Sequence, residues 1–220
     1  NFIPEGGIWM NTQRPEWNDA NNALVGNGVS MVTLCYLRRF LVYFQEVLAQ
    51  TEQQEVQVSV ELLDCFRRMN ATLSEAEALT SGAISNAQRR AILDGLGQAA
   101  SDYRQKIYQE DFSGQKAAFQ LADLHAFIGV TLGHVEHSIA ANKRSDGLYH
   151  AYNLMTVKPD GGIEINYLPE MLEGQVAVLS SGQLNPKESL AVLDALKASA
   201  LFREDQYSYI LYPNKTLPRF

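Results

Sequence analysis

Apolar residues recur at spacings of three and four over most of the chain, which is the pattern of amphipathic helices. Gly26 and Gly28 weaken the first turns of the first helix, whereas Asn185 and Pro186 give the last one an N-cap residue followed by proline in the first turn. Helices are expected over six approximate ranges: 21–50, 56–70, 85–109, 114–143, 169–180 and 186–200.

The pattern changes near the middle of the second half of the chain. Two short runs rich in β-branched residues flank Pro159-Asp160-Gly161-Gly162, and glycines tolerate the positive φ of a tight turn. The sequence therefore predicts a β-hairpin at about 153–167, and an extended aromatic tail at 202–220. The predicted class is mostly α, with long antiparallel helices in one domain, since no boundary stands out.

The composition mainly excludes classes of protein. A chain with 46% hydrophobic and 20% charged residues is globular rather than disordered, and a net charge of −7 provides no general attraction to nucleic acid or anionic membranes. Arg38 and Arg39 interrupt the most apolar stretch, 29–48, so a transmembrane span is rejected. No targeting signal is seen, which leaves a cytoplasmic and a periplasmic location open. Cys35 and Cys65 lie in helical patterns and are expected to be free core thiols.

The densest polar and aromatic cluster, residues 12–22, comes just before the first predicted helix. In one interpretation Asp19 or Asn21 is the N-cap of that helix and Trp17 packs against it. In the other the cluster is a sugar site, because an indole stacks on the apolar faces of a sugar, carboxylates and amides bind its hydroxyls, and an acid protonates the leaving oxygen. The second interpretation makes the cluster the best candidate active site.

The run Glu16-Trp17-Asn18-Asp19-Ala20-Asn21-Asn22 resembles the Asp-Trp-Asn-Asp loop of cellobiose phosphorylase-like enzymes and related inverting (α/α)6-barrel glycosidases. The resemblance implies that Asp19 is the general acid of an inverting glycoside hydrolase or phosphorylase. It also implies a sugar subsite around the loop, formed by Arg14, Glu16, Trp17, Asn18, Asn21 and Asn22.

The same resemblance implies that the helices form part of an (α/α)6-type toroid. Such a toroid has six pairs of helices, and the sequence predicts about half that number. We therefore expect residues 1–220 to be a portion of a larger catalytic domain, completed by the rest of the polypeptide or by a homodimer.

An inverting site needs a second group opposite the acid, either a carboxylate that activates water or a pocket that binds phosphate. Glu170 and Glu173 are three residues apart and so share a helix face, and a solvated or salt-bridged face is their alternative explanation. His150 and Tyr152 precede the predicted hairpin and are candidates for binding a sugar hydroxyl or phosphate. No cofactor is expected beyond inorganic phosphate as co-substrate of a phosphorylase.

Two further interpretations stay open. His134 and His137 share a helix face, but a lone pair of histidines predicts a polar face rather than a metal site. The alternative to an enzyme is a non-catalytic helical interaction or glycan-binding module. Its aromatic anchors would be Trp17, Tyr207, Tyr209 and Tyr212.

Overall fold

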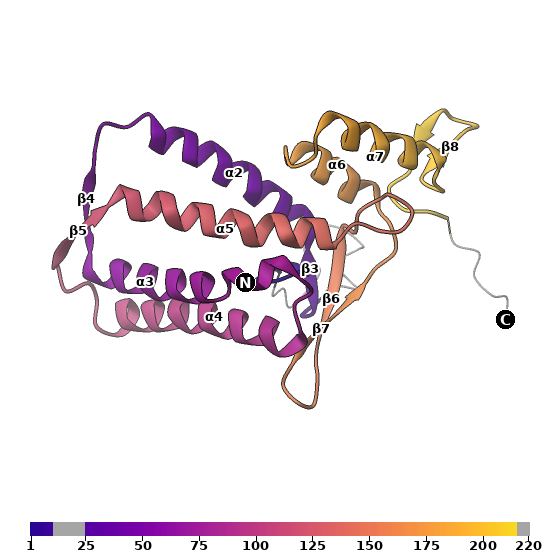
Figure 1. The fold of residues 1–220 in the computed structure, drawn as a ribbon. Coiled ribbons are helices and arrows are strands. Elements are labelled where there is room, and N and C mark those ends of the chain that lie inside the picture. The colour runs from indigo at the N-terminus through magenta and orange to yellow at the C-terminus, as the bar shows by residue number, and fades with distance from the viewer. Residues whose placement is uncertain (11–24, 215–220) are drawn as a thin grey trace.

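The computed structural model describes residues 1–10 and 25–214. Four long helices lie side by side and a five-stranded antiparallel sheet stands at one end of them (Figure 1). Helices account for 54% and strands for 18% of the structure, so the fold is mixed α/β. The predicted mostly-α toroid is therefore wrong, because the segments that join the helices form a sheet instead of further helical pairs.

The four long helices are α2 (Met31–Ala49), α3 (Val60–Glu75), α4 (Asn86–Gln109) and α5 (Leu121–Ala141). At the end of the helices away from the five-stranded sheet, β4 (Glu55–Ser59) pairs with β5 (Lys116–Gln120). Each of these strands leads directly into a helix, β4 into α3 and β5 into α5. The two-stranded sheet thus ties together the ends of the helices opposite the main sheet.

The main sheet has the order β1-β2-β3-β6-β7, with all neighbours antiparallel. Its strands are β1 (Phe2–Ile3), β2 (Gly7–Trp9), β3 (Gly28–Ser30), β6 (Tyr152–Val157) and β7 (Ile163–Tyr167). Strands β6 and β7 form the predicted hairpin, in register from Asn153↔Tyr167 to Val157↔Ile163, and Gly161 in the turn has φ +84°. The hairpin prediction is confirmed.

The C-terminal part is a smaller helical layer. It contains α6 (Leu172–Ser180), α7 (Pro186–Ala198) and a short hairpin of β8 (Phe202–Arg203) with β9 (Ser208–Tyr209). Helix α6 packs against α2, and a 3₁₀ helix, η1 (Glu77–Ser81), joins α3 to α4. Residues 215–220 of the predicted tail lie outside the described residues.

Capping side chains fix where several helices begin. Ser85 before α4 and Asn185 before α7 each form a reciprocal capping box with the residue three positions on, and Pro186 lies in the first turn of α7. Both helices start where the sequence predicts. Helix α2 differs: its N-cap is Ser30, whose Oγ accepts a hydrogen bond of 3.0 Å from the Thr33 N–H.

Three predicted helices are therefore too long at their N-terminal ends. The range 21–50 includes β3, the range 56–70 starts in β4, and the range 114–143 starts before β5. In each case a strand of three to five residues runs straight into a helix, and the apolar residues of the strand continue the helical spacing by chance. Periodicity alone does not separate so short a strand from a first helical turn.

The main core lies between α2, α5 and α6, where Leu34, Ile128, Ile139 and Val178 are almost fully buried. Cys35 and Cys65 are free and buried, as expected. A second cluster, including Ile3, Val29 and Ile163, fills the space between the main sheet and α4.

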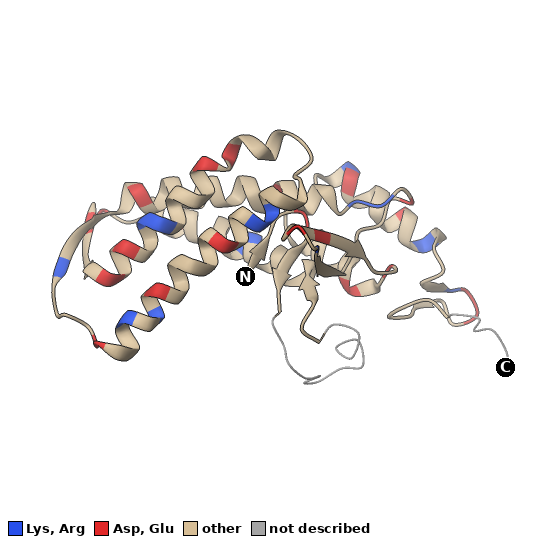
Figure 2. Cartoon of the chain, turned by 90° about the horizontal axis from the view of Figure 1, so that it is seen from below, with Lys and Arg blue, Asp and Glu red and all other residues tan. Residues whose placement is uncertain are grey.

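Acidic and basic residues are interspersed along the helices when the molecule is viewed from below (Figure 2). Within residues 1–10 and 25–214, no helix has both the length and the apolar character needed to cross a membrane.

Candidate functional site

The cluster of predicted sugar-site residues lies in the connection between β2 and β3. Asp19, Arg14, Glu16, Trp17, Asn18, Asn21 and Asn22 fall within 11–24 and are outside the described residues. Both ends of the connection are described. The Met10 N–H donates to the Gly28 carbonyl at 3.0 Å, and Trp9 Nε1 donates to the Gly26 carbonyl at 2.9 Å. The connection therefore leaves and rejoins the main sheet at one place.

The N-cap explanation of the cluster does not hold for the long helix. Ser30 caps α2, so neither Asp19 nor Asn21 is its N-cap. Ser30 also pairs with Tyr152 in the sheet, so the chain enters α2 directly beside the first residue of β6. The cluster is thus separated from α2 by strand β3.

Tyr152 and Glu173 lie close together beside this point. The Tyr152 hydroxyl donates a hydrogen bond of 2.7 Å to Oε2 of Glu173, which stands in the first turn of α6. Tyr152 is buried among Ala151 and Met171, and Met10 packs against the same cluster. Burial, and next the hydrogen bond to Glu173, raises the pKa of the Tyr152 phenol well above its ordinary value of 10, so the phenol is a donor. Two residues predicted separately thus form one pair.

The other two predicted residues have different partners. Glu170 lies before α6, which begins at Leu172, so the predicted shared helix face with Glu173 is wrong. Glu170 forms an ion pair of 3.1 Å with Arg144, which also binds Asp146, so it fits the salt-bridged explanation. His150 is stacked on Tyr167 with ring centroids 4.4 Å apart, and its Nδ1 lies 3.0 Å from the Leu168 carbonyl. Burial lowers the pKa of His150 below its ordinary value of 6.5.

A buried carboxylate that sequence reasoning missed lies in the turn between β1 and β2. Glu5 adopts φ +58°, which is uncommon for a residue with a side chain. Its Oε2 pairs with Arg89 of α4, and its Oε1 accepts the Ile84 N–H at 3.1 Å and lies 3.2 Å from His137 Nε2. The alternation of Phe2-Ile3 and Ile8-Trp9 around Pro-Glu-Gly-Gly was the available signal of a hairpin there.

The side-chain amides of Asn142 and Asn153 connect the Glu5 turn to the main sheet. Asn142 Nδ2 donates to the Glu5 carbonyl at 2.8 Å, and Asn153 Nδ2 donates to the Gly6 carbonyl at 2.9 Å and to Asn142 Oδ1 at 2.8 Å. Glu5 and its partners, which we call the Glu5 network, link the first turn of the chain to α4, α5 and β6. Because both carboxylate oxygens of Glu5 are occupied, the network can position the sheet but has no free acid group.

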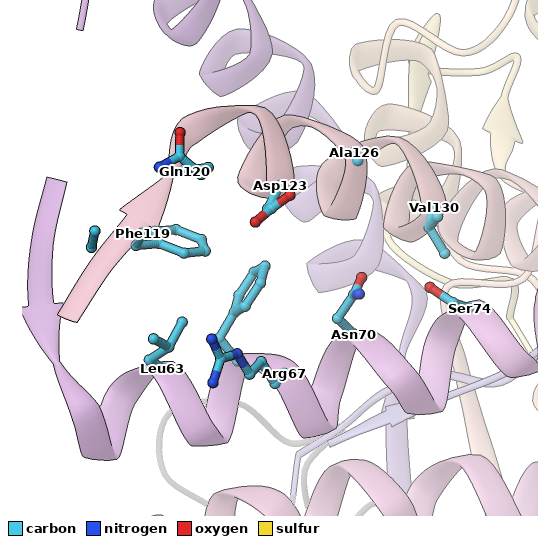
Figure 3. A pocket seen from close by; sticks show the side chains of 11 residues that line it. Leu63, Arg67, Asn70, Ser74, Phe119, Gln120, Asp123, Ala126 and Val130 are labelled. Carbon is cyan, nitrogen blue, oxygen red and sulfur yellow. The ribbon is translucent and has the colours of Figure 1, made fainter. Parts of the chain in front are cut away.

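A concave groove of about 490 Å³ lies between α3 and α5, near the two-stranded sheet (Figure 3). Phe66 and Phe119 form its apolar part, with ring centroids 4.7 Å apart, and Arg67 and Asp123 extend toward it from the two helices. Neither Tyr152 nor Glu173 is among the residues that line this groove.

Helix α2 presents a stripe of exposed aromatic residues. Tyr36, Phe40 and Tyr43 are 48%, 55% and 62% exposed, and Val47 continues the row at 40%. The Arg39 guanidinium lies 5.9 Å from the Tyr36 ring centre. The stripe borders a groove of about 650 Å³ whose other wall is the end of α6 at 180–182. Of the predicted aromatic anchors, Tyr207, Tyr209 and Tyr212 are also exposed, and Trp17 is not described.

The two histidines on α5 have different partners. His134 is buried with Nε2 at 2.8 Å from the Leu73 carbonyl, and His137 contacts Glu5. No group of three or more His, Cys, Asp or Glu residues suited to a metal ion occurs in the described ranges.

Comparison with known protein families and with curated proteins found no match. The resemblance to cellobiose phosphorylase-like enzymes therefore rests on the short run 16–22 alone.

Proposed function

We propose that the chain carries a site that cleaves a glycosidic bond with inversion, with Asp19 as general acid. Trp17 and the neighbouring amides would bind the sugar, and Glu173 would be the second carboxylate. Glycosidases of this kind use a pair of carboxylic acids on opposite faces of the sugar ring.

One observation carries the proposal. Met10, the last described residue before 11–24, packs against the cluster in which the Tyr152 hydroxyl holds Glu173. The connection that contains Asp19 thus starts beside an available carboxylate. Segments that connect the elements of a rigid scaffold commonly bear catalytic groups.

The proposed chemistry is a single displacement. Asp19 gives its proton to the glycosidic oxygen as the bond from that oxygen to the anomeric carbon breaks. In hydrolysis a water oxygen bonds to the anomeric carbon from the opposite face, and Glu173 takes the proton of that water. In phosphorolysis an oxygen of inorganic phosphate bonds there instead, and no proton need pass to Glu173.

Replacing Asp19 by asparagine tests the assignment. We expect turnover of unactivated disaccharides to fall at least about a hundredfold, because general acid catalysis contributes on the order of 10²–10⁴. Dinitrophenyl glycosides should lose much less, since their leaving group needs no proton. Asp64→Asn on the exposed face of α3 is the matched control, and equal thermal midpoints would show that both variants fold. Near-normal disaccharide turnover by Asp19→Asn would contradict the proposal.

A parallel assay separates the two reactions. If the protein is a phosphorylase, product forms only with added inorganic phosphate and includes a sugar phosphate. If it is a hydrolase, the rate is independent of phosphate.

The exposed stripe on α2 favours a second candidate, a module that binds glycans without cleaving them. A rise of about 1.5 Å per residue places Phe40 about 6 Å beyond Tyr36 and Tyr43 about 4.5 Å beyond Phe40 along the helix. These rings form a row of faces on which successive sugars could stack. Tyr43→Ala would then weaken glycan binding, whereas Asp19→Asn would leave it unchanged. Under the enzymatic proposal, Asp19→Asn would lower turnover and Tyr43→Ala would leave it nearly unchanged.

A further inference from the structure

A mostly apolar cavity of about 270 Å³ lies among the four long helices, at their end nearest the main sheet. Every one of the four contributes to its wall: Leu37 from α2, Leu73 from α3, Leu96 from α4 and Phe127 from α5. Phe2 of β1 also lines it. No Asp, Glu, Lys or Arg side chain is among its described lining residues. Its polar lining residues are Asn1, Thr131 and His134, which are too few for a sugar.

Of the polar residues in this wall, His134 is the buried one. It is 1% exposed, and its ring meets Phe2 edge to face with centroids 6.3 Å apart. Its Nε2 lies 2.8 Å from the carbonyl of Leu73, one of the last four carbonyls of α3, which have no partner within the helix. A carbonyl oxygen only accepts hydrogen bonds, so Nε2 carries the proton in this contact.

The other ring nitrogen is left without a partner. In the neutral ring with Nε2 protonated, Nδ1 has a lone pair and accepts a hydrogen bond. Nδ1 is buried and has no hydrogen-bond partner among the residues that the structure describes. Thr131, the nearby hydroxyl in the wall, already donates to the Phe127 carbonyl at 2.8 Å. A buried acceptor of this kind is costly to leave unpaired, which favours a ligand that can donate to it.

We propose that this cavity binds a compact apolar molecule that has one hydrogen-bond donor, in the class of indoles and phenols, with the donor on Nδ1 of His134. An engineered apolar cavity of about 150 Å³ is large enough for benzene, so one of this size has room for a fused two-ring molecule. The site is distinct from the residues proposed to cleave a glycosidic bond, and neither proposal depends on the other.

Indole and indene are a matched pair of probes, because they have nearly the same shape and indene lacks the N–H donor. Isothermal titration calorimetry should show that the chain binds indole about three- to tenfold more tightly than indene, the gain of one net hydrogen bond. Apolar burial alone would give the reverse order, since indene has no polar group to desolvate. Equal or tighter binding of indene would overturn the proposal, as would no binding of either probe, which would leave the cavity to water.

Two variants locate the site. His134→Phe should abolish the preference for indole, and His125→Phe, at an exposed histidine on the same helix, should retain it. Ala100→Phe, from the α4 wall, should fill the cavity and weaken both probes at least tenfold. Thermal midpoints show whether each variant folds, and if His134→Phe does not, Ala100→Phe still decides whether the probes occupy this cavity. If folded Ala100→Phe binds both probes as tightly as the unmodified chain does, the probes do not bind in this cavity and the proposal is wrong.

Discussion

Glu5 and Glu173 are both carboxylates beside the main sheet, but their surroundings differ. Both oxygens of Glu5 are occupied, by Arg89 and by Ile84 and His137, and its side chain is only 9% exposed. Glu173 is half-buried, and among the described residues only the Tyr152 hydroxyl donates to its carboxylate. A carboxylate with both oxygens engaged stabilises the fold, whereas one with a free oxygen can still take part in chemistry. The comparison teaches that burial alone does not identify a catalytic acid.

Removing the charge of Glu5 should give the largest effect on folding. Glu5→Gln leaves the Arg89 guanidinium buried without its carboxylate, and breaking a buried pair in this way costs about 3–5 kcal/mol. Urea denaturation would measure this loss in the free energy of unfolding. Glu77→Gln, at an exposed glutamate of η1, is the control and should change stability by less than about 0.5 kcal/mol.

A double-mutant cycle sharpens the same comparison. Arg89→Met alone leaves Glu5 unpaired, while the double variant Glu5→Gln with Arg89→Met leaves no buried charge. The double variant should therefore lose less stability than the two single variants together. Additive losses would mean that Glu5 and Arg89 contribute independently and that the network is not a unit.

The next largest effect is expected at Gly7, where the Glu5 turn lies against the backbone of Ser30 and Met31 at the start of α2. Gly7 has φ +120°, and an added Cβ would lie 2.7 Å from the Ser30 carbonyl oxygen, which is backbone and cannot easily move. Gly7→Ala should cost about 2–3 kcal/mol from strain and contact together. Gly26→Ala is matched in having positive φ, +77°, but has open space around its Cβ and should cost only about 1–2 kcal/mol. Equal losses in urea denaturation would refute the contact with Ser30.

The features of the fold that the sequence predicts are those with strong local signals. Gly161 and its neighbours mark the β6–β7 turn, and the caps Ser85 and Asn185 mark the starts of α4 and α7. Strands β1, β2 and β3 have only two or three residues each, too few for a periodic pattern. Strands β1 and β2 form a local hairpin, but β3 pairs with β6, which is far away in the sequence. The five-stranded sheet, and with it the mixed α/β class, therefore depends on non-local pairing.

The sequence indicates individual residues of the candidate site but not the contacts between them. Glu173 and Tyr152 each attract attention as polar residues near the hairpin, but their 2.7 Å contact depends on how α6 packs beside β6. Glu170, chosen by the same helical spacing as Glu173, is engaged by Arg144. The predicted helix begins at 169, but α6 begins at Leu172, so the spacing does not place these two carboxylates on one helix face. Tertiary packing decides which of them keeps a free oxygen.

A smaller loss of stability is expected when the partner of Glu173, Tyr152, is changed. Tyr152→Phe removes one hydrogen bond, which is worth about 1 kcal/mol of unfolding free energy. The pKa of Tyr152 is raised in the folded state, so this phenol contributes stability that is fully present below pH 10 and is lost as the pH rises through the higher folded-state pKa. Urea denaturation from pH 8 to 11 should therefore show a shallower alkaline loss for Tyr152→Phe than for the unmodified chain. Tyr108→Phe, at a residue 78% exposed, should keep the original slope.

The smallest effect is expected at His150, which stacks on Tyr167 and has no hydrogen bond to Glu5 or Glu173. Burial lowers the pKa of His150 in the folded state, so the unfolded chain takes up this proton more readily. The contribution of His150 to stability is therefore present above pH 6.5 and is lost as the pH falls through the lower folded-state pKa. His150→Phe keeps a ring to stack on Tyr167 and removes the titration, so its free energy of unfolding should fall less steeply between pH 7 and pH 5. If His150→Phe and the exposed control His125→Phe have the same slope, burial of the His150 ring is not what couples this edge of the sheet to pH.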